Sequence, residues 1–306
     1  WLDATARSAG GPRVAVSSCF PYMGDVQFVA PPRNLWPPPP SPRIRWANAR
    51  FVPLEVVRDL AGEQTLTEKA WYVDGPSSCL LPESAKLCSG PFRPVTRSHA
   101  AVDRLKPGAI EVHRTACIEF AESAGVWAVA AFADESARDE WAATLKGAFR
   151  LLADTGVGGR RSLGWGRSDA PEFVDGSLPE LLLPEAAQHA PAASPIGEEA
   201  QPAPAETVYW MLSLFSPAAD DNIDWRRGSY TLRERGGRIE SPAGSGAEKK
   251  LVRMVEEGSV LVAASAPRGA APDVAPDGFP HPVYRAGFAV SIPIPLRGPE
   301  RTTSAL

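Results

Sequence analysis

Glycine and arginine gather in one short stretch of this sequence, DTGVGGRRSLGWGR at 154–167. Glycine lets the backbone take positive φ angles and approach a partner closely. Consecutive amide N–H groups can bind an anion, and arginine forks suit phosphate oxygens. Residues 150–167 hold four arginines against one aspartate, a local charge of +3. The stretch therefore favours a loop that binds an RNA chain, and a structural turn after a helix is the alternative.

Two nucleotide-binding patterns are excluded by counting positions. A phosphate-binding loop needs a glycine, four residues and then Gly-Lys-Ser/Thr, and the dinucleotide pattern needs Gly-x-Gly-x-x-Gly. Counted from Gly156, both patterns require a glycine where the sequence has Arg161. The loop is also predicted to run from helix to strand, which is the reverse of the dinucleotide site.

A second basic stretch, RPVTRSHAAVDRLKPG at 93–108, contains three arginines and one lysine against one aspartate. His99 within it could stack on a base or donate a hydrogen bond to a phosphate. Taken alone, the stretch is more typical of a solvated hairpin with incidental charge, so it only supports the glycine loop.

Histidines are the candidates for acid–base chemistry, and the chain has four: His99, His113, His189 and His281. Histidine transfers protons near neutral pH, so a metal-independent RNA endonuclease is the alternative function. The sequence has neither a Gly-x-Ser-x-Gly elbow nor a His-Glu-x-x-His motif, which argues against an esterase and a metalloprotease. The four cysteines form no Cys-x-x-Cys pair, so no zinc site is expected. We therefore assign no catalytic residue, no metal and no cofactor, and predict that the chain is not an enzyme.

A protein–protein adaptor that uses the proline run 36–42 is a third alternative for the function.

The elements around the loop follow from hydrophobic periodicity. Residues 112–122 and 126–133 are predicted as two strands of a hairpin. A helix follows from Ser136, with Ser136 and Asp139 as a capping box, and Gly156 lies just past its end. SLGWGR is then expected to return as a strand. Strand, strand, helix, loop and strand are the later part of a ferredoxin-like βαββαβ unit.

The second half is rich in predicted strands. They lie at 208–215, at either side of a hairpin turn at Gly236-Gly237, in KLVRMV and SVLVAA, and at 284–294. Between the halves, residues 184–206 are mostly alanine and proline and are predicted to be a linker.

Composition bounds the class of protein. The 306 residues are 44% hydrophobic and carry a net charge of −4, so the chain can bury a core and is not basic overall. No apolar run approaches the ~20 residues of a membrane span, and no signal peptide is visible. We expect a cytoplasmic protein, because the cysteines do not suggest a disulfide framework.

A family resemblance rests on several segments in order. GVGGRRSLGWGR resembles the glycine-rich loop of the RAMP superfamily, the RNA-binding proteins of prokaryotic CRISPR systems. TRSHAAVDRL resembles a segment of the type III-A (Csm) subunit that caps the crRNA 5′ end. Five further segments resemble parts of the same subunit. In their order along the chain they are SSCFPYMGDVQFVAPP, VYWMLSLFSP, RRGSYTLRERGGRI, KKLVRMVEEGSVL and HPVYRAGFAVSIPI.

The resemblance implies an α+β protein of two ferredoxin-like (RRM-like) domains with insertions, residues 1–183 and 207–306, joined by the linker 184–206. The first strand and helix of such a protein would precede this chain, which opens WLDATARSAG. The implied partners are the 5′ tag of the crRNA, the large polymerase-like Csm subunit and the adjacent backbone RAMP subunit; no membrane is implied. The implied function is a non-catalytic RNA-binding subunit in antiviral defence.

The resemblance also implies three groups of RNA-binding residues. The loop group is Gly156, Gly158, Gly159, Arg160, Arg161, Ser162, Gly164 and Gly166; the hairpin group is Arg97, Ser98, His99 and Arg104; the C-terminal group is His281 and Arg285. Tyr284 lies in the same C-terminal motif and is expected to pack.

Overall fold

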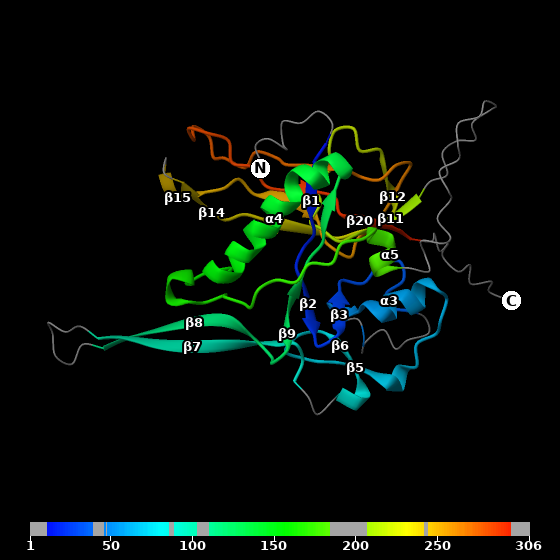
Figure 1. Ribbon diagram of the computed structural model, residues 1–306, viewed down its shortest axis with the longest axis horizontal. Helices are drawn as coiled ribbons and strands as arrows, with labels where there is room; N and C mark the ends of the chain where they lie inside the picture. The colour runs from blue at the N-terminus through cyan, green and yellow to red at the C-terminus, as the bar shows by residue number, and fades with distance from the viewer. Residues whose placement is uncertain are drawn as a thin grey trace. The chain divides into compact units, whose positions relative to one another are not determined.

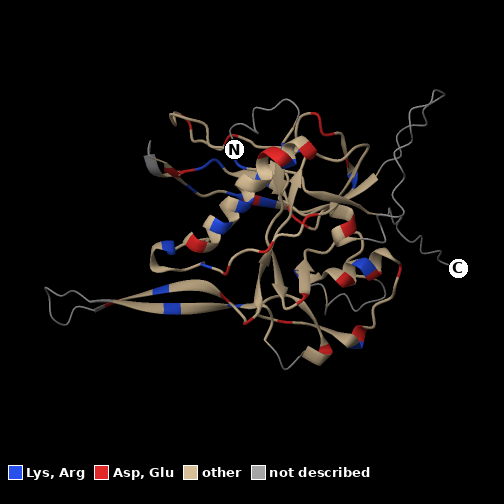
Figure 2. Cartoon of the chain, viewed as in Figure 1, with Lys and Arg blue, Asp and Glu red and all other residues tan. Residues whose placement is uncertain are grey.

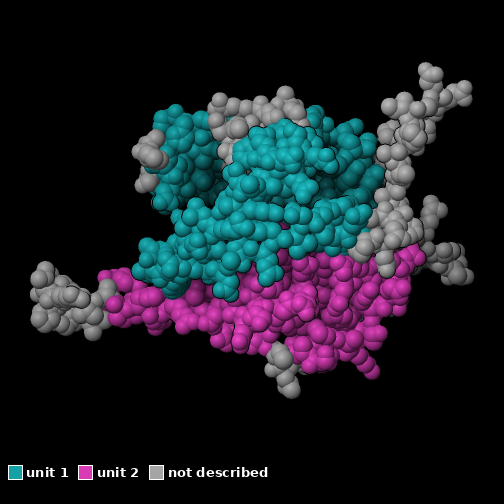
Figure 3. All heavy atoms as spheres, viewed as in Figure 1, with its two compact units in different colours: residues 1–18, 129–294 teal, residues 19–128, 295–306 magenta. Residues whose placement is uncertain are grey.

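The computed structural model describes residues 11–38, 46, 48–85, 89–102, 110–183, 207–241 and 244–294. They form a mixed α/β fold of several small sheets and few helices (Figure 1). The chain divides into two compact units (Figure 3). Unit 1 contains residues 1–18 and 129–294, and unit 2 contains residues 19–128 and 295–306. These units differ from the predicted domains 1–183 and 207–306, which stay a prediction.

Unit 1 begins with a strand from the start of the chain and is otherwise built from the part after residue 128. Its strands up to the linker are β1 (Val14–Val16) and β10 (Ala130–Phe132), and its helical segments are α4 (Glu135–Thr155), η3 (Arg161–Leu163) and α5 (Leu178–Leu182). Its later strands are β11 (Thr207–Met211), β12 (Ile223–Ser229), β13 (Leu232–Arg235), β14 (Arg238–Ser241), β15 (Gly244–Glu248), β16 (Val252–Val255), β17 (Val260–Ala263), β18 (Gly269–Ala270), β19 (Gly287–Phe288) and β20 (Ser291–Ile294).

The core of unit 1 lies on an antiparallel four-stranded sheet of order β12-β17-β11-β20. All four residues of β17, Val-Leu-Val-Ala, are buried, as expected of an inner strand covered on both faces. Met211 and Leu261 pack with Phe215 and Val255 in one apolar cluster. Smaller ladders pair β1 with β10, β13 with β16, β14 with β15, and β18 with β19.

Helix α4 carries the glycine loop at its end, and its sequence explains both of its ends. Asp134 is the N-cap, and its Oδ1 accepts a hydrogen bond from the Ala137 N–H at 2.7 Å. The predicted capping box at Ser136 is therefore wrong, since the carboxylate two residues earlier reaches the first turn. Gly156 ends the helix with φ 88°, as predicted.

Unit 2 contains a second four-stranded antiparallel sheet of order β4-β3-β2-β9. Its elements are β2 (Phe20–Met23), β3 (Val26–Val29), β4 (Val52–Pro53), α3 (Leu54–Ala61), η1 (Glu68–Ala70), β5 (Trp71–Val73), β6 (Leu80–Pro82), η2 (Glu83–Ala85), β7 (Phe92–Val102), β8 (Ile110–Phe120) and β9 (Ala124–Trp127). Helix α3 buries Val56, Val57 and Leu60 on one side, at helical spacing.

Strands β7 and β8 form a long two-stranded ribbon with eleven residue pairs, from Phe92↔Phe120 to Val102↔Ile110 (Figure 1). The predicted hairpin between 112–122 and 126–133 is therefore wrong. The second of these segments splits instead into β9, which pairs with β2, and β10, which pairs with β1.

The predicted hairpin at Gly236-Gly237 is also wrong, because β13 pairs with β16 and β14 pairs with β15. A two-residue type I′ turn needs positive φ at both central positions, and of these two glycines only Gly237 has it, at 136°. In residues 207–241 and 244–294 the structure shows strands and no helix. The ferredoxin-like order of elements in this half is not confirmed and stays a prediction.

Candidate RNA interface

The glycine loop, residues 156–167, is closed at its base by backbone contact. The Val157 N–H donates to the Gly166 carbonyl at 3.0 Å. A Cβ atom added at Gly156 would lie 2.3 Å from the Trp165 carbonyl oxygen, and one added at Gly166 would lie 2.0 Å from the Val157 carbonyl oxygen. Gly156 and Gly166 are therefore needed for the shape of the loop.

The other three glycines of the loop face open space. A Cβ atom added at Gly158, Gly159 or Gly164 would have no neighbour within 4 Å. Gly158 and Gly164 have φ angles of 91° and 83°, which only glycine adopts without strain, whereas the φ of Gly159 is not positive. The middle of the loop is thus accessible to a partner down to its backbone.

Five consecutive backbone N–H groups in this open part, residues 158–162, donate no hydrogen bond within the described part of the chain. We call these five amides the amide cradle. Backbone N–H groups that follow one another in irregular conformation form concave sites for anions. The cradle can therefore bind a phosphate group without any side chain.

Side chains at the cradle add positive charge and apolar surface. Arg160 takes a left-handed conformation, with φ 56° and ψ 29°, and its guanidinium lies 5.9 Å from the ring centre of Trp165. Arg161 and Ser162 are exposed. Val157 and Leu163 are also exposed, by 66% and 60%. Exposed apolar and cationic groups beside open amides suit a partner with both phosphates and bases.

The return strand SLGWGR that the sequence predicts does not form. Residues 161–163 are one turn of 3₁₀ helix, and Gly164 and Gly166 take left-handed φ angles of 83° and 75°. Strand residues need φ near −120°, so these glycines prevent a strand.

The second predicted group lies on ribbon β7–β8, where Figure 2 shows bands of Lys and Arg. Side chains alternate between the two faces of a strand, so Arg97 and His99 share one face and Ser98 lies on the other. His99 is directly opposite His113 in the register. The structure therefore divides this group between two faces, and Arg104 lies outside the described residues.

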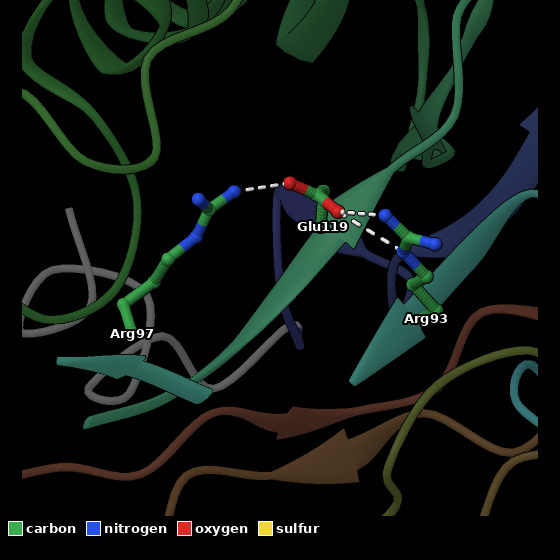
Figure 4. A network of polar contacts seen from close by, with 3 residues as sticks. All are labelled: Arg93, Arg97 and Glu119. Carbon is green, nitrogen blue, oxygen red and sulfur yellow. Dashed lines mark hydrogen bonds and ion pairs between the residues drawn. The ribbon is translucent and has the colours of Figure 1, made fainter. Parts of the chain in front are cut away.

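Glu119 neutralises part of the basic face of the ribbon (Figure 4). The Arg93 side chain donates twice to one carboxylate oxygen, from Nε at 3.0 Å and from Nη2 at 2.8 Å, and Arg97 bonds the other oxygen. The hydrogen bond from Arg93, together with the charges of both arginines, lowers the pKa of Glu119. Sequence reasoning missed this carboxylate, because Glu119 meets Arg93 only through the strand register.

The C-terminal group is held by its own hydrogen bonds. His281 Nδ1 donates to the Pro282 carbonyl at 3.0 Å, and its Nε2 forms a hydrogen bond with the Ser241 hydroxyl at 2.9 Å. Both ring nitrogens are thus engaged in the fold. Arg285 Nη2 donates to the Gly236 carbonyl at 2.7 Å, and Tyr284 forms a backbone bridge with Asp273.

The three groups are divided between the two compact units. The loop and the C-terminal group belong to unit 1, whereas Arg97, Ser98 and His99 belong to unit 2. Within the described ranges of unit 1, no hydrogen bond or ring contact joins the glycine loop to His281 or Arg285.

The described residues also hold no cluster of three His, Cys, Asp or Glu side chains that could bind a metal. None of the described helices is both long and apolar enough to cross a membrane.

Comparison with known proteins points to one family. Residues 205–294 match the model of the CRISPR Csm4 C-terminal domain. No curated protein matches the sequence. A chain of the Csm3-Csm4 subcomplex of the type III-A CRISPR-Cas interference complex has the same fold, with a TM-score of 0.57 and 16% identity over 93% of this chain and 84% of that chain. A Csm1-Csm4 cassette in complex with pppApA matches less well, with a TM-score of 0.49 and 17% identity over 98% of this chain and 83% of the other. The chain therefore contains a domain at residues 205–294 that matches the Csm4 C-terminal domain family.

Proposed function

We propose that this chain is a non-catalytic RNA-binding subunit of a type III-A CRISPR interference complex in the prokaryotic cytoplasm. In this role it holds the repeat-derived 5′ tag of the crRNA. It also docks the large polymerase-like subunit, Csm1, and contacts the adjacent backbone RAMP subunit, Csm3. The Csm4 C-terminal domain supports this assignment, and the similar solved structure is a Csm3-Csm4 subcomplex.

The amide cradle is the observation that carries the RNA-binding part of the proposal. Its five N–H groups have no acceptor in the described part of the chain, and Gly158 and Gly159 leave them sterically open. Arg160 and Arg161 add two charges at the same place. Phosphate contacts from backbone amides and arginines fix the path of a nucleic acid and do not read its sequence. This combination suits the backbone of a fixed RNA end better than it suits a catalytic site.

The test is to co-express the chain with the complex, purify it and end-label the bound RNA. We expect a protected RNA that begins with a fixed repeat-derived tag. If the complex assembles but its RNA has variable 5′ ends, this chain does not hold the tag. If the complex lacks RNA altogether, the adaptor function based on the proline run 36–42 is favoured instead.

We also propose the finer organisation that the family resemblance implies. Residues 1–183 and 207–306 are two ferredoxin-like domains joined by the linker 184–206. The four-stranded antiparallel sheet of unit 1, order β12-β17-β11-β20, is compatible with the sheet of such a domain. A crystal structure of the protein would test this order of elements.

One observation keeps the endonuclease as a second candidate. His99 lies opposite His113 on the ribbon, and two histidines can serve as acid and base in RNA cleavage without a metal. The test is incubation of the purified chain with repeat RNA and a metal chelator. We expect no cleavage; cleavage that disappears in His113→Ala would favour the endonuclease.

A further inference from the structure

Arg235 at the end of β13 differs from the other arginines of the paired strands β13 and β16. Arg253 on β16 is directly opposite Glu234 and donates to it from Nε at 3.0 Å. Arg233 forms an ion pair with Glu256. The residue opposite Arg235 is Val252, and within the described part of the chain no carboxylate or other acceptor contacts the Arg235 side chain.

Arg285 lies beside this unpaired cation. Its Nη2 donates to the carbonyl of Gly236, the residue that follows Arg235. Its Nε is buried, and no atom of the described protein accepts a hydrogen bond from it. A buried donor without a partner is unfavourable in a folded protein and marks a place where a water, an ion or a ligand binds.

The pKa of Arg285 also reflects its burial and its proximity to Arg235. Burial, and then the positive charge of Arg235, lower the pKa of Arg285. The two guanidinium groups are therefore close enough to repel each other. Among the described residues, no carboxylate acts on Arg285 to offset this repulsion. An arginine keeps its charge under these conditions, so the pair is a local excess of two positive charges.

We propose that Arg235 and Arg285 bind one phosphate group of an RNA chain on the C-terminal half of the protein. Two neighbouring guanidinium forks can donate to several oxygens of one phosphate, and the phosphate charge removes their repulsion. The site rests on the proposed function, because that function supplies the RNA. It adds Arg235, which was not among the predicted RNA-binding residues, to Arg285, for which the family resemblance implied RNA binding.

The experiment titrates the full chain with a labelled single-stranded RNA at several salt concentrations. Arg235→Gln removes a guanidinium that has no hydrogen-bond or ion-pair partner in the described protein, so it should leave the fold intact. We expect it to weaken RNA binding about tenfold and to reduce the salt slope by about 0.7. Arg253→Gln is the matched control, because Arg253 lies on β16, which pairs with β13, but is already bonded to a carboxylate. We expect the RNA affinity of this variant to change little.

Arg235→Glu separates a binding role from a structural role. The new carboxylate would neutralise Arg285. The variant should therefore resist heat or urea at least as well as the wild type, while binding RNA more weakly than Arg235→Gln.

Wild-type affinity and salt slope in Arg235→Gln would overturn this site and leave the proposed function intact. An acidic peptide such as polyglutamate is the rival ligand: if Arg235→Gln loses polyglutamate binding but keeps RNA binding, the RNA assignment is wrong. If the wild-type chain itself fails to bind RNA, the proposed function and this site are both wrong.

Discussion

Gly159 provides a test of the amide cradle that separates RNA binding from folding. A side chain there would meet no protein atom within 4 Å, and the backbone is not in the left-handed region. Gly159→Val should therefore change the free energy of unfolding by no more than about 0.5 kcal/mol, as at other open surface positions. The same side chain would be added within the amide cradle, residues 158–162.

The size of the effect follows from the contacts that would be lost. A hydrogen bond to a charged group contributes about 1.5–3 kcal/mol. Loss of one bond between a cradle amide and a phosphate should weaken RNA binding by about 10- to 150-fold.

Two further glycine variants serve as controls for this effect. Gly147→Val adds a side chain at another open glycine, outside the loop on α4, and should leave RNA affinity unchanged. Gly166→Ala forces a Cβ against the Val157 carbonyl at 2.0 Å and should lower stability as well as affinity.

The assay combines urea unfolding of each variant with an RNA titration at one fixed salt concentration. Gly159→Val should unfold like the wild type and bind RNA weakly. Unchanged stability together with wild-type RNA affinity would refute the cradle, because the backbone would then make no contact that a side chain can block.

Three further predictions concern other parts of the chain. Arg160→Ala with Arg161→Ala should weaken RNA binding and reduce the salt slope by about 1.4, or about 0.7 for each single-strand phosphate contact; an unchanged slope in a salt titration would count against it. Asp134→Ala removes the N-cap of α4 and should lower the free energy of unfolding by about 1 kcal/mol in a urea titration, and a loss below the error of the measurement would show that the cap contributes nothing. Burial raises the pKa of Cys79 to about 12; because the reactive thiolate forms only as pH rises towards that value, Cys79 should resist alkylation at pH 8 until the protein is unfolded, and rapid labelling of the folded chain would contradict its buried position.

Local signals in the sequence predicted helix α4 and its end. Trp141, Leu145, Phe149 and Leu152 recur at helical spacing. The first three are partly buried in the structure, whereas Leu152 is exposed by 42%. Gly156 ends the helix as its position predicted. These features depend on residues within one or two turns of each other, which is why one sequence is enough to identify them.

Strand partners could not be predicted in the same way. Hydrophobic alternation marks 112–122 as a strand, but it does not say that the partner is β7 rather than the segment that follows. Partner choice depends on packing between distant segments. The same limit applies to β13, whose partner β16 follows it after β14 and β15.

The candidate site shows the same division between local and distant information. The glycine loop could be found from its composition, including the open Gly158 and Gly159. The neutralisation of Arg93 and Arg97 by Glu119, and the isolation of Arg235, depend on strand register and became visible only in the structure. Strand register therefore decides which of these cations are paired with a carboxylate.

In the proposed function, the glycine loop holds the 5′ end of a crRNA. The most direct measurement treats the purified complex with a 5′-to-3′ exoribonuclease and maps the 5′ ends of the bound RNA. In the wild type we predict a resistant RNA with one fixed 5′ end, and in complexes that contain Arg160→Ala with Arg161→Ala we predict an RNA shortened from that end. Equal protection of the 5′ end in both complexes would contradict the account.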